Sequence, residues 1–122
     1  CTSDFLPTIA NWLRLDLPED LTLDGINLAP IIDQAVAGEV RQRGRGIGFE
    51  SARLATWTTD QFKLVASLKR NPGGEPTVTR RQLFDLVEDP AETEDVASEF
   101  PEVVAQLAAK LTRWREAIRK RP

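Results

Sequence analysis

The sequence predicts a small α+β fold, with a four-stranded antiparallel sheet packed by a long C-terminal helix and a short N-terminal helix. Between residues 46 and 86, four short segments rich in aromatic and β-branched residues are separated by turn-forming residues. After Pro101, apolar residues instead recur every three or four positions, which is the spacing of one helix face. We expect two regions, a helical segment at 1–45 and a subdomain of sheet plus terminal helix at 46–122.

The first predicted element is a short amphipathic helix near the N-terminus. Four apolar residues recur there at helical spacing: Phe5, Ile9, Trp12 and Leu13. Thr2 or Ser3 can cap this helix, and Pro7 is tolerated only near its start.

A second, brief helix is expected after the loop that contains Asp24 and Gly25. Asn27 can cap it, and it should run from Leu28 to near Gly38, because asparagine favours helix starts and glycine favours helix ends.

The four strand segments are expected to follow one another as a meander. They are residues 46–51, 53–59, 62–68 and 81–86. The residues from Thr59 to Gln61 should close a hairpin between the second and third strands. The stretch from Asn71 to Pro76 should form a longer, mobile loop before the fourth strand, because it is rich in proline and glycine. Short connections of this kind predict an antiparallel sheet with one buried face.

The helix that begins at Pro101 carries the clearest pattern in the chain. Its apolar stripe consists of Val104, Leu107, Leu111, Trp114 and Ile118. Proline suits a first helical turn, and basic residues complement the helix dipole at the other end. Those basic residues are Arg113, Arg115, Arg119, Lys120 and Arg121. The helix should therefore lie across the sheet.

Composition excludes several functional classes. The 122 residues include 16 basic and 19 acidic residues, largely interspersed, so we expect no nucleic-acid partner. No apolar run approaches a membrane span, so no membrane partner is expected. A single cysteine excludes an internal disulfide and a zinc site built on paired cysteines. The chain has no histidine, the commonest general base and metal ligand. We therefore predict no catalytic residue and no metal site in this chain.

The acidic run from Asp85 to Ala97 could be a calcium loop, a carboxylate cluster or a junction between two elements. A helix-loop-helix calcium loop that starts at Asp85 needs a glycine at its sixth position, which is Pro90. We interpret the run as the junction between the last strand and the last helix, in which Asp89, Glu92 and Asp95 make cap and turn hydrogen bonds. Its structural motif is Asp85, Asp89, Pro90, Glu92 and Asp95. Replacing Asp89 with alanine should destabilise the fold, as the loss of a cap does.

Lys63 and Arg53, both in the predicted sheet region, could hold an anion. Exposed cations on strands more often protect the edge of a sheet, and we favour that interpretation. The segment from Gly44 to Gly48 precedes a strand and not a helix, so we expect no backbone anion site there.

Four blocks of the sequence resemble, in order, the C-terminal end of sulfatases of the alkaline phosphatase superfamily. They read SDFLPTIANWL, LDGINLAPII, TTDQFKLVASL and LFDLVEDPAETEDVASEFPEVVAQLAAKLTRW, and they cover nearly the whole chain. The last block is the most specific, with matches at Asp85, Asp89, Pro90, Glu92, Asp95 and Ala97. Three positions depart from the family pattern: Phe84 for a common tyrosine, Asp95 for a common asparagine, and Thr58 for a frequent arginine.

The resemblance implies that a longer parent hydrolyses sulfate esters and that this chain is a structural subdomain beside its active-site cleft, inactive alone. It also implies a calcium ion and a formylglycine, made from a Cys/Ser-x-Pro-x-Arg motif, in the N-terminal part of the parent. Cys1 is not that nucleophile, because Ser3 stands where proline is required and Phe5 where arginine is required. The implied partners are the N-terminal catalytic domain of the same parent chain and a sulfate ester substrate, in a periplasmic or secreted protein.

The candidates for the rim of the substrate cleft are Glu50, Arg53 and Trp57, together with the stretch from Asn71 to Pro76. The first helix should pack on the large domain of the parent. In this chain its apolar face should therefore be exposed, and it should favour a homodimer or repack against the sheet.

Two other functional classes remain open. The chain could be the tail of a phosphonate or phosphodiester hydrolase of the same superfamily, or a stand-alone interaction module. Turnover of phosphate diesters in preference to sulfate esters would distinguish the first, and the absence of the Cys/Ser-x-Pro-x-Arg motif from the reading frame would distinguish the second.

Overall fold

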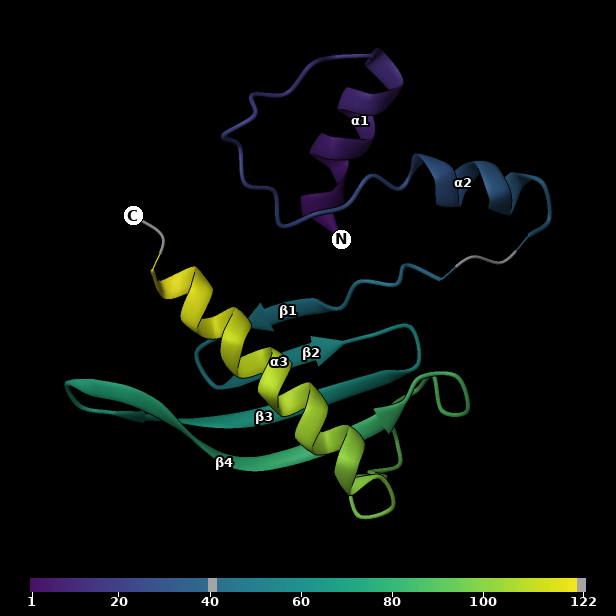
Figure 1. The fold of residues 1–122 in the computed structure, drawn as a ribbon. Coiled ribbons are helices and arrows are strands. Elements are labelled where there is room, and N and C mark those ends of the chain that lie inside the picture. The colour runs from purple at the N-terminus through teal and green to yellow at the C-terminus, as the bar shows by residue number, and fades with distance from the viewer. Residues whose placement is uncertain (40–41, 121–122) are drawn as a thin grey trace. The chain divides into compact units, whose positions relative to one another are not determined.

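Figure 1 shows the computed structural model, which describes residues 1–39 and 42–120. The chain divides into an N-terminal unit, Cys1–Arg43, and a C-terminal unit, Gly44–Pro122. The predicted fold class is confirmed, because the structure contains a four-stranded antiparallel sheet, a long C-terminal helix packed on it and a short N-terminal helix. The assignment of 1–45 and 46–122 to separate parts of a sulfatase stays a prediction.

The N-terminal unit consists of a 3₁₀ turn and two helices. They are η1 (Thr2–Asp4), α1 (Phe5–Leu13) and α2 (Ala29–Val36). The predicted caps of α1 are wrong: Asp4 occupies the cap position, no side chain caps the helix, and the chain enters it directly from η1. Asn27 does serve the start of α2, since its Oδ1 accepts the N–H of Ala29 at 2.9 Å, although Leu28 holds the cap position.

Asp4 and Thr8 hold the loop between α1 and α2 against α1. The buried Asp4 carboxylate accepts hydrogen bonds from the N–H of Ile26 and from the Arg43 guanidinium, each at 2.8 Å. Thr8 donates to the carbonyl of Asp4 at 2.6 Å and accepts from the N–H of Leu28 at 2.9 Å. Burial alone would raise the pKa of Asp4, but the bonds from Arg43 and Ile26 outweigh it and leave the pKa below its usual value.

The C-terminal unit contains the predicted meander. Its strands are β1 (Ile47–Glu50), β2 (Leu54–Thr58), β3 (Phe62–Asn71) and β4 (Gly74–Asp85), in that spatial order and antiparallel throughout. The predicted turn between β2 and β3 is confirmed: the Thr59 hydroxyl accepts from the N–H of Phe62 and donates to its carbonyl, both at 2.9 Å. β4 ends at Asp85, so Leu86 lies outside the strand that was predicted to contain it.

The predicted long loop from Asn71 to Pro76 is wrong. Asn71 pairs with Gly74 across a two-residue turn, so β3 and β4 continue into one long hairpin. Pro72 followed by Gly73, whose φ is +70°, is the combination that a type II turn requires. Pro76 is tolerated within β4 because β4 is an edge strand and the register shifts nearby. Residues interpreted as strand breakers therefore build a tight turn.

The core lies between one face of the sheet and α3 (Pro101–Arg119). The helix runs obliquely across the sheet and contacts all four strands (Figure 1). Pro101 occupies the first turn, as predicted, and Arg121 lies outside the described residues. Burying each leucine of this core contributes about 1.5–3 kcal/mol. The buried residues are Ala55, Leu64, Ala66, Leu68, Leu83, Leu107 and Leu111.

Two glycines allow tryptophan rings to lie directly against β1 and the residues before it. A Cβ at Gly48 would lie 2.3 Å from the Trp114 ring, and a Cβ at Gly46 would lie 2.4 Å from Nε1 of Trp57. The two rings meet edge to face, with their centroids 6.5 Å apart. Any larger residue at these positions would have to displace a ring.

Candidate functional site

The acidic run between β4 and α3, here called the acidic junction (residues 85–97), is a network of turn hydrogen bonds. Asp85 Oδ1 accepts from the N–H groups of Val87 at 3.0 Å and Glu88 at 3.3 Å. Its Oδ2 accepts from the side-chain amide of Gln61 at 3.1 Å. Desolvation acts to raise the pKa of Asp85, but these three bonds outweigh it and lower the pKa. The carboxylate therefore organises the turn that follows β4.

Asp89 makes the turn hydrogen bonds that the sequence predicts. Its Oδ2 accepts from the N–H of Thr93 at 2.6 Å and from the N–H of Glu94 at 2.8 Å. The Glu94 N–H contributes most to lowering the pKa of Asp89, with Thr93 adding to it. Asp89 accepts from two backbone N–H groups and from the Thr93 hydroxyl, so it orders the loop.

Asp95 ties the junction to the outer edge of β4. Its Oδ1 accepts from the N–H of Leu83 at 3.1 Å and from that of Ala97 at 3.2 Å. The next residue, Val96, donates its N–H to the carbonyl of Leu83 at 2.9 Å. The N–H and the carbonyl of Leu83 therefore both have hydrogen-bond partners in the acidic junction. The junction thus covers this part of β4, which is an edge strand.

Glu92 makes a turn hydrogen bond, as predicted, because its N–H donates to the carbonyl of Asp89 at 3.1 Å, and its side chain makes a further contact. It adopts a left-handed backbone conformation with φ +57°, and both of its carboxylate oxygens accept from Lys63 Nζ at 2.7 Å. Lys63 thus joins β3 to the acidic junction. Its charge already has a carboxylate partner, which argues against the alternative that it holds an anion.

The three residues proposed for a cleft rim do not form one group. Glu50 and Trp57 lie on the sheet face that α3 covers, and Glu50 accepts two hydrogen bonds from Arg115, which lowers the pKa of Glu50. Arg53 is exposed in the turn between β1 and β2, where its carbonyl accepts the N–H of Leu68 at 2.7 Å. Their position at a substrate cleft stays a prediction.

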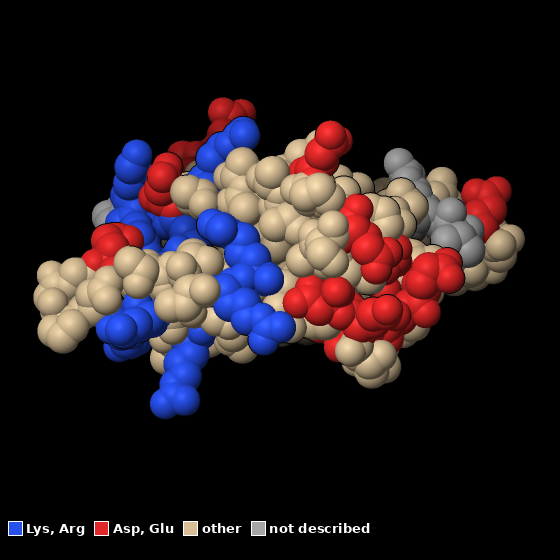
Figure 2. All heavy atoms as spheres, turned by 90° about the horizontal axis from the view of Figure 1, so that it is seen from below, with Lys and Arg blue, Asp and Glu red and all other residues tan. Residues whose placement is uncertain are grey.

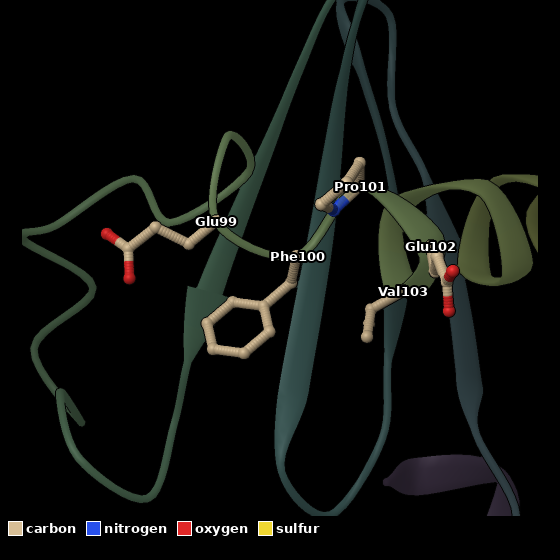
Figure 3. Close-up of a pocket in the computed structure, with 5 residues that line it drawn as sticks. All are labelled: Glu99, Phe100, Pro101, Glu102 and Val103. Atoms are coloured by element: carbon tan, nitrogen blue, oxygen red, sulfur yellow. The ribbon is translucent and has the colours of Figure 1, made fainter.

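A hollow of about 340 Å³ lies at the start of α3 (Figure 3). The hollow is lined by Glu99, Phe100, Pro101, Glu102 and Val103. Figure 3 shows the carboxylates of Glu99 and Glu102 pointing away from one another, on either side of Phe100. General acid and base groups must converge on one substrate, so this hollow offers no such pair.

A second hollow, of about 270 Å³, lies within the N-terminal unit and is lined mainly by apolar side chains. Its residues are Phe5, Thr8, Ile9, Trp12, Leu28 and Ile32. The apolar residues of α1 are exposed, by 62% at Phe5, 47% at Ile9, 54% at Trp12 and 63% at Leu13. The predicted exposed patch is therefore confirmed. We call these four residues the α1 face.

The described residues offer no metal centre. Within residues 1–39 and 42–120, no group of three or more His, Cys, Asp or Glu side chains could hold a metal ion. Calcium takes roughly six to eight oxygen ligands, whereas Asp85, Asp89 and Asp95 of the acidic junction accept from amides. In that same part of the chain, no helix has the length and apolar character that a membrane span needs. The hydrogen bonds of the acidic junction organise the chain reversal between β4 and α3.

Two ion pairs that shape the C-terminal unit escaped the sequence analysis. Lys63 and Glu92 are 29 positions apart, and Glu50 and Arg115 are 65 positions apart, so no local spacing links them. The basic residues near the end of α3 were explained by the helix dipole. A better indication of the pair is Glu50, which lies on the same strand as Gly48. Because α3 approaches Gly48 closely, its basic residues come within reach of Glu50.

No family model and no curated protein matches the sequence. Among solved structures, a Bacteroides thetaiotaomicron sulfatase described in the metabolism of multiple glycosaminoglycans is 24% identical with a TM-score of 0.63, covering 97% of this chain and 24% of that chain. A protein solved with its substrate D-glucosamine-2-N,6-O-disulfate is 18% identical with a TM-score of 0.61, covering 93% and 23%. The phosphonate monoester hydrolase of Agrobacterium radiobacter is 24% identical with a TM-score of 0.53, covering 93% and 24%.

These likenesses show the fold. The chain has the fold of a part of these larger proteins, which include a sulfatase and a phosphonate monoester hydrolase, so the predicted resemblance is confirmed at the level of the fold. The chain spans about a quarter of the length of the structures it matches.

Proposed function

We propose that this chain is the C-terminal subdomain of a sulfatase, inactive alone, within a parent that hydrolyses sulfate esters. The observation that supports this most is the extent of the structural match, which covers 97% of this chain and only 24% of a sulfatase. The acidic junction adds support, because its best-placed carboxylates bind backbone amides and Lys63. A piece that organises structure and lacks reacting groups suits a subdomain.

The chemistry of hydrolysis is proposed to belong to the rest of the parent. Calcium does not fit the described part of this chain, which holds no cluster of three candidate ligands. Formylglycine does not fit Cys1, because the sequence around Cys1 lacks the proline and arginine of the required motif. We place both groups in the N-terminal catalytic domain of the same parent chain.

The α1 face is the proposed surface for that domain. Phe5 and Trp12 are more than half exposed and line the apolar hollow of the N-terminal unit. Burying an apolar side chain of this size contributes about 1.5–3 kcal/mol, so covering the face would stabilise the parent substantially. Of the rim candidates, Arg53 is the best placed to reach a substrate, because Glu50 and Trp57 are engaged with α3.

A second candidate is the corresponding subdomain of a phosphonate monoester or phosphodiester hydrolase. The match to the Agrobacterium radiobacter enzyme, with a TM-score of 0.53 over 93% of this chain, supports it. The two candidates share the fold of this portion, so they can be distinguished only by which class of ester the parent hydrolyses.

The test begins with the reading frame upstream of Cys1, searched for Cys/Ser-x-Pro-x-Arg. The intact product, the 122-residue chain and an intact variant with alanine in place of the motif nucleophile are then compared on 4-nitrophenyl sulfate and on a phenylphosphonate monoester. Turnover of the sulfate by the intact product alone supports the proposal. Preference for the phosphonate supports the second candidate. A frame without the motif and without activity on either ester overturns both and leaves an interaction module.

A further inference from the structure

The N-terminal unit has almost no hydrophobic core. In its described residues, 1–39 and 42–43, the buried apolar residues are two alanines, Ala10 and Ala29. Nine large apolar side chains of the unit are exposed instead, from 37% at Ile32 to 84% at Val36. The C-terminal unit differs, because five leucines are buried between its sheet and α3. Burial of large apolar side chains is the main source of folding stability, and the N-terminal unit lacks most of it.

The two helices of this unit are too short to be stable by themselves. α1 has nine residues and α2 has eight, whereas isolated helices shorter than about 12–15 residues are marginal in water. Asp4 and Thr8 are buried and hold the loop between the helices. Hydrogen bonds of this kind add little net stability, because the same groups are bonded to water in the unfolded chain. The unit therefore needs a further source of stability.

Three devices commonly stabilise units of this size: disulfides, metal ions and association with a partner. The unit spans Cys1–Arg43, close to the length of about 40 residues below which one of these devices is usually needed. A disulfide within the unit is excluded, because the chain has one cysteine. A metal site is not offered by the described residues, which contain no group of three or more candidate ligands. Association with a partner is the device that remains.

The hollow between α1 and α2 indicates the chemistry of that partner. Its volume is about 270 Å³, and five of its six lining side chains are apolar. The sixth, Thr8, already donates to the Asp4 carbonyl and accepts from the Leu28 N–H. The hollow therefore has no group free to bind an ion or a polar ligand, and it suits an aliphatic or aromatic side chain.

The charges of the two units support the same conclusion. Figure 2, seen from below, shows lysine and arginine gathered over one side of the molecule and aspartate and glutamate over the other. Such a surface is suited to water. α1, by contrast, contains no charged residue, although Phe5, Ile9, Trp12 and Leu13 are exposed on it. A contiguous apolar surface of this kind marks a contact with another apolar surface.

We infer that the N-terminal unit completes its hydrophobic core with apolar side chains of the parent chain outside these 122 residues, and that it is stably folded only with them. One of these side chains enters the hollow between α1 and α2. The identity of the partner rests on the proposed function. The match to the Bacteroides thetaiotaomicron sulfatase supports it, because the match extends over 97% of this chain, which makes up only 24% of that sulfatase. The fold of the unit therefore recurs where much more chain is present to cover it.

A second copy of this chain is the competing partner. It could cover the same face only at the concentration of free protein, whereas a covalently joined segment acts at an effective concentration in the millimolar range. The parent segment should therefore displace the second copy wherever both are present.

Hydrogen exchange in the 122-residue chain and in the intact product tests this inference. In a dilute, monomeric solution of the 122-residue chain, the amides of residues 9–13 should exchange at least about a hundredfold faster than those between β2 and β3, because the N-terminal unit opens more easily. In the intact product these α1 amides should slow by roughly a hundredfold or more. Equal exchange of α1 in the two forms would overturn the inference. So would protection in the 122-residue chain that rises with concentration to the level of the intact product, because a second copy would then suffice.

Trp12→Ser and Val36→Ser locate the covered face. Trp12 lines the hollow, and serine has a helix propensity close to that of tryptophan, so the substitution changes α1 itself little. In the intact product Trp12→Ser should speed α1 exchange by roughly tenfold or more, but in the dilute 122-residue chain by less than about twofold. Val36→Ser, outside the hollow, should change it by less than about twofold in both forms. Equal effects of the two variants in the intact product would show that α1 is not the covered face. Exchange between β2 and β3 confirms that each variant folds.

The exchange result can be separated from the ester assay. If α1 exchanges alike in both forms while the intact product turns over the aryl sulfate, the shared core is wrong and the proposed function stands. If α1 is protected only in the intact product while that product is inactive on sulfate esters, the shared core stands and the proposed function is wrong.

Discussion

Arg115 on α3 donates two hydrogen bonds to Glu50 on β1, from Nε to Oε2 at 2.8 Å and from Nη2 to Oε1 at 3.1 Å. The two side chains are only 12% and 21% exposed, and Arg119 adds a longer ion pair to Glu50 at 3.8 Å. This paired geometry joins the last turns of the helix to the first strand of the sheet. It is a stronger arrangement than a surface ion pair, because solvent screens it less.

The first prediction concerns the pH dependence of this pair. Arg115 lowers the pKa of Glu50 below its usual 4.5, so the folded state favours the ionised form. The stabilisation is fully present above the unfolded pKa and is lost as pH falls through the folded pKa. Glu50→Gln should therefore lower the free energy of unfolding by about 1–3 kcal/mol at neutral pH and by less in acid. Urea titrations near neutral pH and at about pH 3 measure this.

Arg115→Lys is the matched control for that experiment. Lysine keeps the positive charge but cannot form the two parallel bonds, so the variant should be intermediate between wild type and Arg115→Ala. A loss in Glu50→Gln that is the same size at neutral and acid pH would show that packing, and not ionisation, is responsible.

The second prediction concerns the close approach of α3 to β1. Gly48→Ala should destabilise the C-terminal unit by about 1–3 kcal/mol, because the new methyl group meets the Trp114 ring at 2.3 Å. Gly74→Ala is the matched control, since the nearest atom to its Cβ lies 3.7 Å away. Thermal denaturation followed by tryptophan fluorescence compares them. If both variants have the melting temperature of the wild type, the Trp114 ring can move aside and the contact is not close-packed.

The third prediction concerns the acidic junction. Asp95→Ala should cost about 1–2 kcal/mol, because the amides of Leu83 and Ala97 lose their acceptor. Asp95→Asn keeps an oxygen at the same position, so it should retain most of the stability. Denaturant unfolding of both variants distinguishes the bond from the charge. Equal losses would mean that the carboxylate acts by its charge, through Arg80, and not as an acceptor.

Much of the fold follows from the sequence because its signals are local. The stripe that contains Leu107 and Leu111 predicts α3 correctly, and period-two segments predict the sheet. The hairpin turn at Pro72 and Gly73 was missed because proline and glycine both break strands and build tight turns, and only the pairing of Asn71 with Gly74 decides between the two.

The site could be predicted only in part, for the same reason. Asp89 bonds residues four and five positions ahead, which the spacing of the acidic run indicates. Glu92 pairs with Lys63, which is 29 positions away in the sequence. No sequence pattern indicates the left-handed backbone conformation of Glu92. Pairings between distant residues depend on strand register and loop path, which composition does not encode.

The fourth prediction concerns the α1 face. The chain should form a concentration-dependent dimer, because a contiguous apolar surface on α1 is exposed. Ile9→Ser/Trp12→Ser should shift it toward monomer in size-exclusion chromatography with light scattering. Val36→Ser, at a residue 84% exposed on α2 and outside the apolar hollow, should leave the dimer unchanged. A wild-type monomer that binds no hydrophobic dye would contradict the prediction.

The hydrogen bond from the Leu83 N–H to Asp95 gives the C-terminal unit a built-in reporter of local opening. Leu83 lies in β4, yet its amide proton is held by a side chain of the acidic junction and not by a neighbouring strand. Its exchange with solvent deuterium should follow the opening of the junction, while amides between β2 and β3 exchange only when the sheet opens. The junction and the sheet can therefore be assigned separate opening free energies within one molecule, and the difference between them measures how firmly the last helix is tethered.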